Sequence, residues 1–224
     1  MHGIYLHGFA SSAKTAKGVA LGQRLARTLA SYRIPALEGE PADEAAFFHL
    51  TMTGIRDRAA AAVAALPDDG RGCLLIGSSL GGYTAALLAA QRTSPRIRAL
   101  LLIAPAFGFT TRWSARLGPQ GTALWQRQGH LPFFHHAHER EMPLGYGFLE
   151  SCQNLPDLPD HPGVPVAIVH GIQDETVDHR QSIAYQQGHA GVELHLVDGD
   201  HRLMEPHHED LIAWCAEDLV RRTR

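Results

Sequence analysis

The sequence predicts an α/β fold, a doubly wound and mostly parallel sheet of six strands flanked by helices. Short apolar runs recur along the chain and alternate with segments of helical periodicity. The runs are apolar throughout, which indicates that helices cover both faces of the sheet. Because crossovers between parallel strands are right-handed, this alternation gives a doubly wound topology.

Six segments have the length and composition of strands. The second contains Pro35, which has no N–H for a sheet ladder, so we expect this strand toward an edge of the sheet. The expected strands are residues 3–6, 32–37, 72–76, 99–104, 164–169 and 192–197.

Five segments, four between these strands and one after the last, have helical patterns. The first has apolar residues at Val19, Leu21, Leu25 and Leu29, which is typical of an amphipathic helix. The second is rich in alanine and is stopped by the Pro-Asp-Asp-Gly turn that follows it. The expected helices are residues 16–31, 55–66, 82–92, 176–188 and 208–222.

The segment 108–162 lies between two strands and is longer than a plain crossover. It is rich in aromatic residues, glycine and proline. Insertions at the carboxyl end of a parallel sheet overhang the site there, so we interpret it as a small cap that supplies an acyl- or alcohol-binding wall. The alternative is a crossover helix with a long surface loop. The whole chain, residues 1–224, is expected to be one domain with this insertion.

Composition excludes several classes of partner. The chain has 224 residues, enough for one substantial core, and a net charge of −3, which gives no electrostatic reason to expect nucleic acid or an anionic membrane. We expect neither a signal peptide nor a membrane span, because no window has the required apolar length. Three cysteines without CxxC spacing indicate a reduced cytoplasm rather than a disulfide framework. The oligomeric state is not predicted.

The run Gly77-Ser78-Ser79-Leu80-Gly81-Gly82 follows an apolar strand and precedes a helix. Strand, G-x-S-x-G and helix form the pattern of a nucleophile elbow, where small residues must stand two places before and after the serine. Ser79 meets this requirement, whereas Ser78 has Ile76 two places before it. Ser79 is therefore the expected nucleophile. The alternative is a tight turn in a non-catalytic binding protein, since the run is neither a P-loop nor a dinucleotide-binding fingerprint.

A serine nucleophile needs a base and an acid that orients the base. In α/β-hydrolases these follow in the order Ser, Asp or Glu, His. Asp174 comes after an apolar strand and is the expected acid, with Glu175 as local rival and helix capping as the alternative role for Asp174. His201 comes after the last strand and is the expected base among 15 histidines.

The oxyanion of acyl transfer needs two preorganised N–H donors. We expect one from Leu80, the residue after the nucleophile, and the other from Phe9 in the loop that ends the first strand. Gly8 lets this loop approach closely. We also expect His7, Gly8 and Tyr83 to contact the substrate, a small-molecule acyl ester or thioester. The alternative for His7 is a packing residue in a plain turn.

Histidine clusters raise the alternative of a metal-dependent hydrolase. His135, His136 and His138 lie close in sequence, as do His207 and His208, but the chain contains no H-E-x-x-H motif. We therefore expect no metal and no other cofactor.

Four stretches also carry a family resemblance. They are His7-Gly8-Phe9-Ala10-Ser11-Ser12 with Lys17, Gly77 to Tyr83, Asp174-Glu175-Thr176-Val177-Asp178 with Arg180-Gln181 and Ala184-Tyr185, and Gly199-Asp200-His201. Together they resemble the small bacterial YqiA-like esterases of the α/β-hydrolase superfamily. The resemblance implies a cytosolic serine esterase for short acyl esters, or a thioesterase or acyltransferase with the same residues, in which Ser79, Asp174 and His201 are nucleophile, acid and base. The chain departs from the family in its longer, histidine-rich segment 112–160 and in Asp200, where a neutral residue is more frequent.

Overall fold

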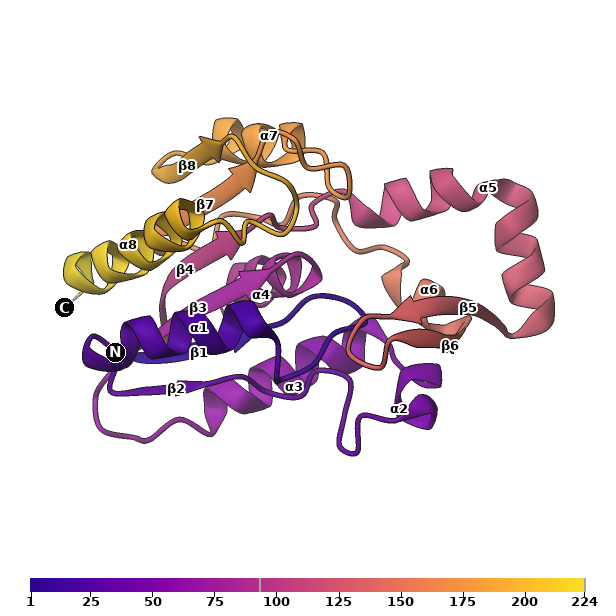
Figure 1. Cartoon of the computed structure of the whole chain (residues 1–224), viewed down its shortest axis with the longest axis horizontal. Helices are drawn as coiled ribbons and strands as arrows, with labels where there is room; N and C mark the ends of the chain where they lie inside the picture. Colours follow the sequence, from indigo (N-terminus) through magenta and orange to yellow (C-terminus); the bar gives the residue numbers. More distant parts are fainter. Residues whose placement is uncertain (93, 224) are drawn as a thin grey trace.

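A computed structural model describes residues 1–92 and 94–223, and it confirms the predicted fold. Six strands form one sheet in the order β2-β1-β3-β4-β7-β8, and every neighbouring pair is parallel (Figure 1). Residues 93 and 224 belong to the predicted domain but lie outside the described residues. The strands are β1 His2–Leu6, β2 Ser31–Arg33, β3 Cys73–Ser78, β4 Ile97–Ile103, β7 Val166–Gly171 and β8 Val192–Val197.

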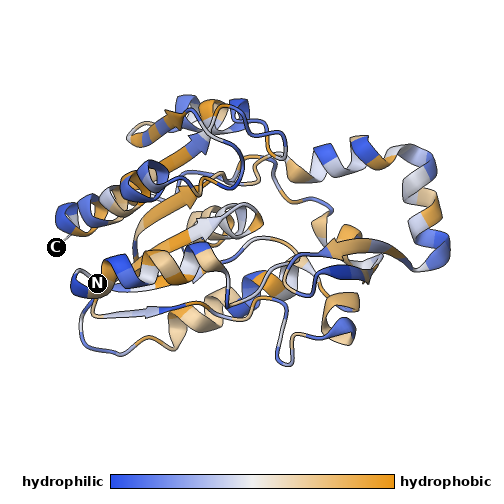
Figure 2. Cartoon of the chain, viewed as in Figure 1, coloured by the Kyte–Doolittle hydropathy of each residue, from blue (hydrophilic) through white to orange (hydrophobic). Residues whose placement is uncertain are grey.

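Helices cover both faces of the sheet, as the apolar strands predict. On one face, α8 packs against β3, β4 and β7, with α1 beside it. On the other face, α4 packs against β1, β3 and β4, α3 packs against β1 and α4, and α7 packs against β8. Figure 2 shows mostly hydrophobic strands in the centre of the sheet and helices that carry both hydrophilic and hydrophobic residues. The helices are α1 Ala16–Arg24, the 3-10 turn η1 Leu25–Arg27, α3 Met52–Ala64, α4 Leu80–Ala90, α7 Arg180–Gly188 and α8 Pro206–Arg222. No helix in the described ranges combines the length and apolar character needed to cross a membrane.

Some element bounds differ from the predicted ones for identifiable reasons. The second strand lies at the sheet edge but ends at Arg33, before Pro35. The helix predicted from residue 176 begins at Arg180, because the Asp174 carboxylate accepts the N–H groups of Thr176 and Val177 in a turn. The short helix α2 Glu44–Phe48, capped by Asp43, has no counterpart in the prediction.

Residues 108–162 contain more regular secondary structure than either the predicted cap or the alternative of a crossover helix with a long surface loop. It contains helix α5 Phe109–Gln128, the antiparallel hairpin of β5 His130–His135 and β6 Arg140–Gly145, and helix α6 Gly147–Cys152. The long helix bends at Gly118, where φ is 61°, just before Pro119. Figure 1 shows this segment at the end of the molecule opposite the two termini, beyond the carboxyl ends of the strands.

The turn between β3 and α4 leaves no room for a side chain at Gly81. A Cβ atom there would lie 2.1 Å from the carbonyl oxygen of Leu6 and 2.5 Å from that of His7. Both are backbone atoms, so relief requires the helix and β1 to move apart. We expect Gly81→Ala to lower the free energy of unfolding by more than about 3 kcal/mol in urea denaturation. Gly188→Ala is the control, since no atom lies within 4 Å of its added Cβ, and we expect a change within about 1 kcal/mol. Equal stabilities of the two variants would contradict this packing argument.

Candidate active site

Ser79 occupies a strained backbone position at the turn between β3 and α4. Its φ of 55° and ψ of −120° lie outside the regions that L-residues ordinarily adopt. The turn closes tightly on both sides, because a Cβ atom at Gly77 would lie 2.3 Å from the Gly81 carbonyl oxygen. The structure thus gives the physical reason for the G-x-S-x-G spacing around this serine.

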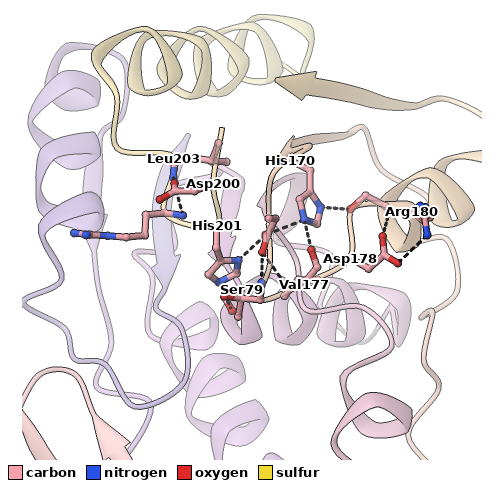
Figure 3. A network of polar contacts seen from close by, with 12 residues as sticks. Ser79, His170, Val177, Asp178, Arg180, Asp200, His201 and Leu203 are labelled. Carbon is pink, nitrogen blue, oxygen red and sulfur yellow. Dashed lines mark hydrogen bonds and ion pairs between the residues drawn. The ribbon is translucent and has the colours of Figure 1, made fainter. Parts of the chain in front are cut away.

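Ser79, His201 and Asp174 form one chain of hydrogen bonds (Figure 3). The Ser79 Oγ lies 3.1 Å from Nε2 of His201, and the Nδ1 of the same ring lies 2.6 Å from Oδ2 of Asp174. The three side chains follow the carboxyl ends of β3, β8 and β7, which meet at one edge of the sheet. The Asp174 side chain is fully buried and that of His201 is 23% exposed, so the serine end of the chain faces the surface.

Both oxygens of Asp174 are fully used. Oδ1 accepts the N–H groups of Thr176 and Val177 at 2.8 and 2.7 Å, while Oδ2 accepts from His201 and, at 3.1 Å, from Nε2 of His170. Burial on its own would raise the pKa of Asp174, but the hydrogen bonds from the two imidazoles and the Val177 N–H outweigh it and hold this pKa well below its ordinary value. Asp174 therefore caps the turn with one oxygen and accepts a hydrogen bond from His201 with the other. Glu175, the local rival, is exposed.

The loop after β1 lies directly against Ser79. A Cβ atom at Gly8 would be 3.4 Å from the Cβ of Ser79. The backbone N–H groups of Phe9 and Leu80, the two expected oxyanion donors, have no hydrogen-bond acceptor within residues 1–92 and 94–223. Within the described residues both N–H groups are therefore left for another acceptor, and their role as oxyanion donors stays a prediction.

His7 and Tyr83, two of the expected substrate contacts, both have buried side chains with partners inside the protein. The His7 side chain is buried, with Nδ1 donating to the Gly8 carbonyl at 3.0 Å and Nε2 accepting from the Leu37 N–H at 3.2 Å. Burial lowers its pKa, which fits the neutral ring that this pairing needs. Tyr83 is fully buried and its hydroxyl donates to the Pro156 carbonyl at 2.7 Å. His7 thus braces the loop, and Tyr83 braces the helix that follows the serine.

Aromatic side chains of the inserted segment gather around Phe9. The Phe9 ring centroid lies 5.3 Å from that of Trp113 and 5.5 Å from that of Phe148. Trp113 in turn stacks on Phe133 at 5.3 Å with the planes nearly parallel. The N–H of His136 donates to the Ala10 carbonyl at 2.9 Å, so the hairpin is also tied to the loop through its backbone.

Three of the clustered histidines lie close to oxygen atoms of the protein. His135 lies 2.7 Å from a Glu38 oxygen, His138 donates to the Ala42 carbonyl at 2.9 Å, and His208 lies 3.1 Å from the Asp198 carbonyl. In the part of the chain that the structure describes, no group of three or more His, Cys, Asp or Glu side chains is arranged to hold a metal ion.

One histidine of the site was missed by the sequence reasoning. His170, the fifth residue of β7, is fully buried and shares the Oδ2 atom of Asp174 with His201 (Figure 3). A histidine at the end of an apolar strand, four residues before the expected acid, is the signal that could have identified it.

Comparison with known proteins gives a family and a fold. The model of an uncharacterised protein family, UPF0227, matches residues 2–215. No curated protein sequence matches the chain significantly.

Solved structures match over almost the whole chain. Mouse alpha/beta hydrolase domain-containing protein 10 has a TM-score of 0.81 at 23% identity, covering 99% of this chain and 90% of its own. Est1E from Butyrivibrio proteoclasticus has a TM-score of 0.74 at 22% identity, covering 99% and 88%, and it has also been solved with ferulic acid bound. The esterase domain of a Rhodothermus marinus protein has a TM-score of 0.64 at 17% identity, covering 99% and 86%. The chain therefore has the α/β-hydrolase fold.

The lowered pKa of Asp174 predicts how stability depends on pH. Because the folded protein holds this carboxyl ionised below its ordinary pKa of about 4, its contribution is fully present above that value and is lost as the pH falls. We expect the melting temperature of the wild type to fall more steeply between about pH 5 and pH 2 than that of Asp174→Asn. Asp68→Asn, which changes a side chain that is 97% exposed, is the control and should keep the wild-type slope. Parallel curves for wild type and Asp174→Asn would contradict the prediction.

Proposed function

Since the chain belongs to the protein family UPF0227, the YqiA-like family that its motifs indicate, and has the α/β-hydrolase fold, we propose that it is a serine hydrolase that cleaves short acyl esters. The observation that carries this proposal is the hydrogen-bonded chain from Ser79 through His201 to Asp174, with the serine on a strained turn. A non-catalytic binding protein would have no need of such strain, which costs on the order of 1–3 kcal/mol.

In the proposed mechanism, Ser79 attacks the acyl carbonyl while His201 Nε2 takes the hydroxyl proton. Asp174 stabilises the imidazolium that forms. The N–H groups of Phe9 and Leu80 donate to the oxyanion, and His201 then passes its proton to the departing alcohol. Water then attacks the acyl-enzyme while His201 takes its proton. His201 passes this proton to Ser79 Oγ as the bond to the acyl group breaks and the acid leaves.

The same steps apply to a thioester, and with an alcohol in place of water they give acyl transfer. Both remain alternatives within the proposed chemistry, because the groups that act on the acyl carbonyl are the same.

The three cysteines are buried and free, which supports a place in the reducing cytoplasm.

We further propose that residues 108–162 act as a cap on a single domain and supply the acyl-binding wall. Phe9 carries one expected oxyanion donor on its backbone, and its ring is packed against Trp113 of this segment. Trp113 and Phe133 are only partly buried, so their rings offer apolar surface next to the loop that faces Ser79. Est1E binds ferulic acid, which makes an aromatic ester a useful member of a substrate panel.

The nucleophile is tested by replacing each of the two adjacent serines. We expect Ser79→Ala to lower the turnover of p-nitrophenyl acetate by on the order of 10⁴-fold or more and to abolish labelling by a fluorophosphonate, with the melting temperature little changed. Ser78→Ala removes the neighbouring hydroxyl and should retain both activity and labelling. Near-normal hydrolysis by Ser79→Ala would contradict the assignment of Ser79 as the nucleophile.

The acyl-binding wall is tested on two neighbouring phenylalanines of β5 that face opposite ways. Phe133 stacks on Trp113, whereas Phe134 is 52% exposed. We expect Phe133→Ala to lower kcat/KM for octanoyl and cinnamoyl esters about tenfold relative to acetyl esters, because lost apolar contact weakens binding of the larger acyl group. Phe134→Ala should leave the acyl preference unchanged. An equal effect of the two substitutions would argue against the wall.

A further inference from the structure

His170 contacts Asp174, one of the three residues of the proposed site. Its ring is fully buried at the carboxyl end of β7, and both of its nitrogens have partners. Nε2 lies 3.1 Å from Oδ2 of Asp174 and 3.2 Å from the Val177 carbonyl, and Nδ1 lies 2.7 Å from Oγ of Ser182 in α7.

These partners fix the position of the proton on the His170 ring. The Val177 carbonyl and the ionised Asp174 carboxylate only accept hydrogen bonds, so Nε2 carries a hydrogen and donates to both. Nδ1 lies against the hydroxyl of Ser182, a side chain that is itself fully buried and that can either donate to or accept from a ring nitrogen. His170 is therefore held as a donor to Asp174 through Nε2.

The two imidazoles compete for a single oxygen atom. Oδ2 of Asp174 accepts from His201 at 2.6 Å and from His170 at 3.1 Å, while the backbone N–H groups occupy Oδ1. Each donor withdraws negative charge from the carboxylate, so the bond from His170 reduces the strength with which Asp174 stabilises a protonated His201. It also prevents rotation of the carboxylate away from the His201 ring.

We propose that His170 is a positioning residue that acts through Asp174, orienting the His201 ring and setting the pH at which it loses its proton. This inference rests on the proposed serine chemistry. Other charged groups near the network are the same in all the variants. Lys17 of α1 interacts electrostatically with the carboxylates of Asp200, Asp174 and Glu209 and with Arg202. The His179 ring lies 6.5 Å from that of His170. Only a substitution that takes away the donor at the Nε2 position removes the bond between His170 and Asp174.

Two polar substitutions separate the two nitrogens of His170. His170→Gln can place an amide N–H where Nε2 stood and so keeps the donor to Asp174. His170→Asn is shorter, reaches only the position of Nδ1, and keeps the contact with Ser182 while losing the donor. The second-order rate of Ser79 labelling by a fluorophosphonate, measured against pH, reports the protonation of His201 without any assumption about the substrate. Turnover of p-nitrophenyl acetate gives kcat and KM separately.

We expect the acid limb of the labelling profile to move to higher pH by about half a unit in His170→Asn, because the carboxylate regains charge toward His201. In the same variant kcat should fall about tenfold with KM within about twofold. His170→Gln should keep the wild-type limb and most of kcat. His170→Leu, which lacks both contacts, is a second variant without the donor and should show the same shift should His170→Asn not fold.

Three results would count against these assignments. An unmoved or lowered acid limb in the folded variants without the donor would overturn the role of His170, and so would a shift in His170→Gln equal to that in His170→Asn. A wild-type protein that no fluorophosphonate labels at any pH would instead overturn the proposed function itself.

Discussion

The tight packing of the turn between β3 and α4 against β1 is the constraint on which the rest of the site depends. Side chains at residues 77 and 81 would collide with backbone oxygens, so only glycine permits this approach. The approach forces Ser79 into a backbone conformation with a positive φ and leaves the N–H of Leu80 unpaired within the described residues. The strain is held by the buried strands on either side, which cannot relax without opening the core.

The other groups of the candidate site lie at the same edge of the sheet. The carboxylate of Asp174 is buried with four N–H donors around it, which makes an isolated negative charge tolerable in the interior. On the other side, Phe9 joins the loop near Ser79 to the aromatic cluster of the inserted segment. A change in the packing of that segment would therefore be transmitted to an expected oxyanion donor as well as to the acyl-binding wall.

Sequence reasoning predicted the features that depend on local chemistry. The G-x-S-x-G spacing identified the turn at Ser79, and apolar strands ending in polar turns brought Asp174 and His201 to the same edge. It missed what depends on packing between distant segments. Tyr83, an expected substrate contact, is fully buried and its hydroxyl donates to the Pro156 carbonyl, a contact between distant segments that spacing around the serine does not reveal. The hairpin of β5 and β6 was also missed, because its sequence has no two-residue turn motif of the common kind. The short helix α2 was missed too, because it depends on burial against other segments.

The central claim is that Ser79 carries the acyl group during turnover. The most direct measurement is rapid acid quenching during hydrolysis of a slowly deacylating ester, followed by peptide mapping with mass spectrometry. A serine hydrolase of the proposed kind accumulates one acyl group per chain on Ser79, and the adduct disappears when the substrate is exhausted. An unmodified Ser79 during rapid turnover, or an acyl group on Ser78 or any other residue instead, would contradict the claim.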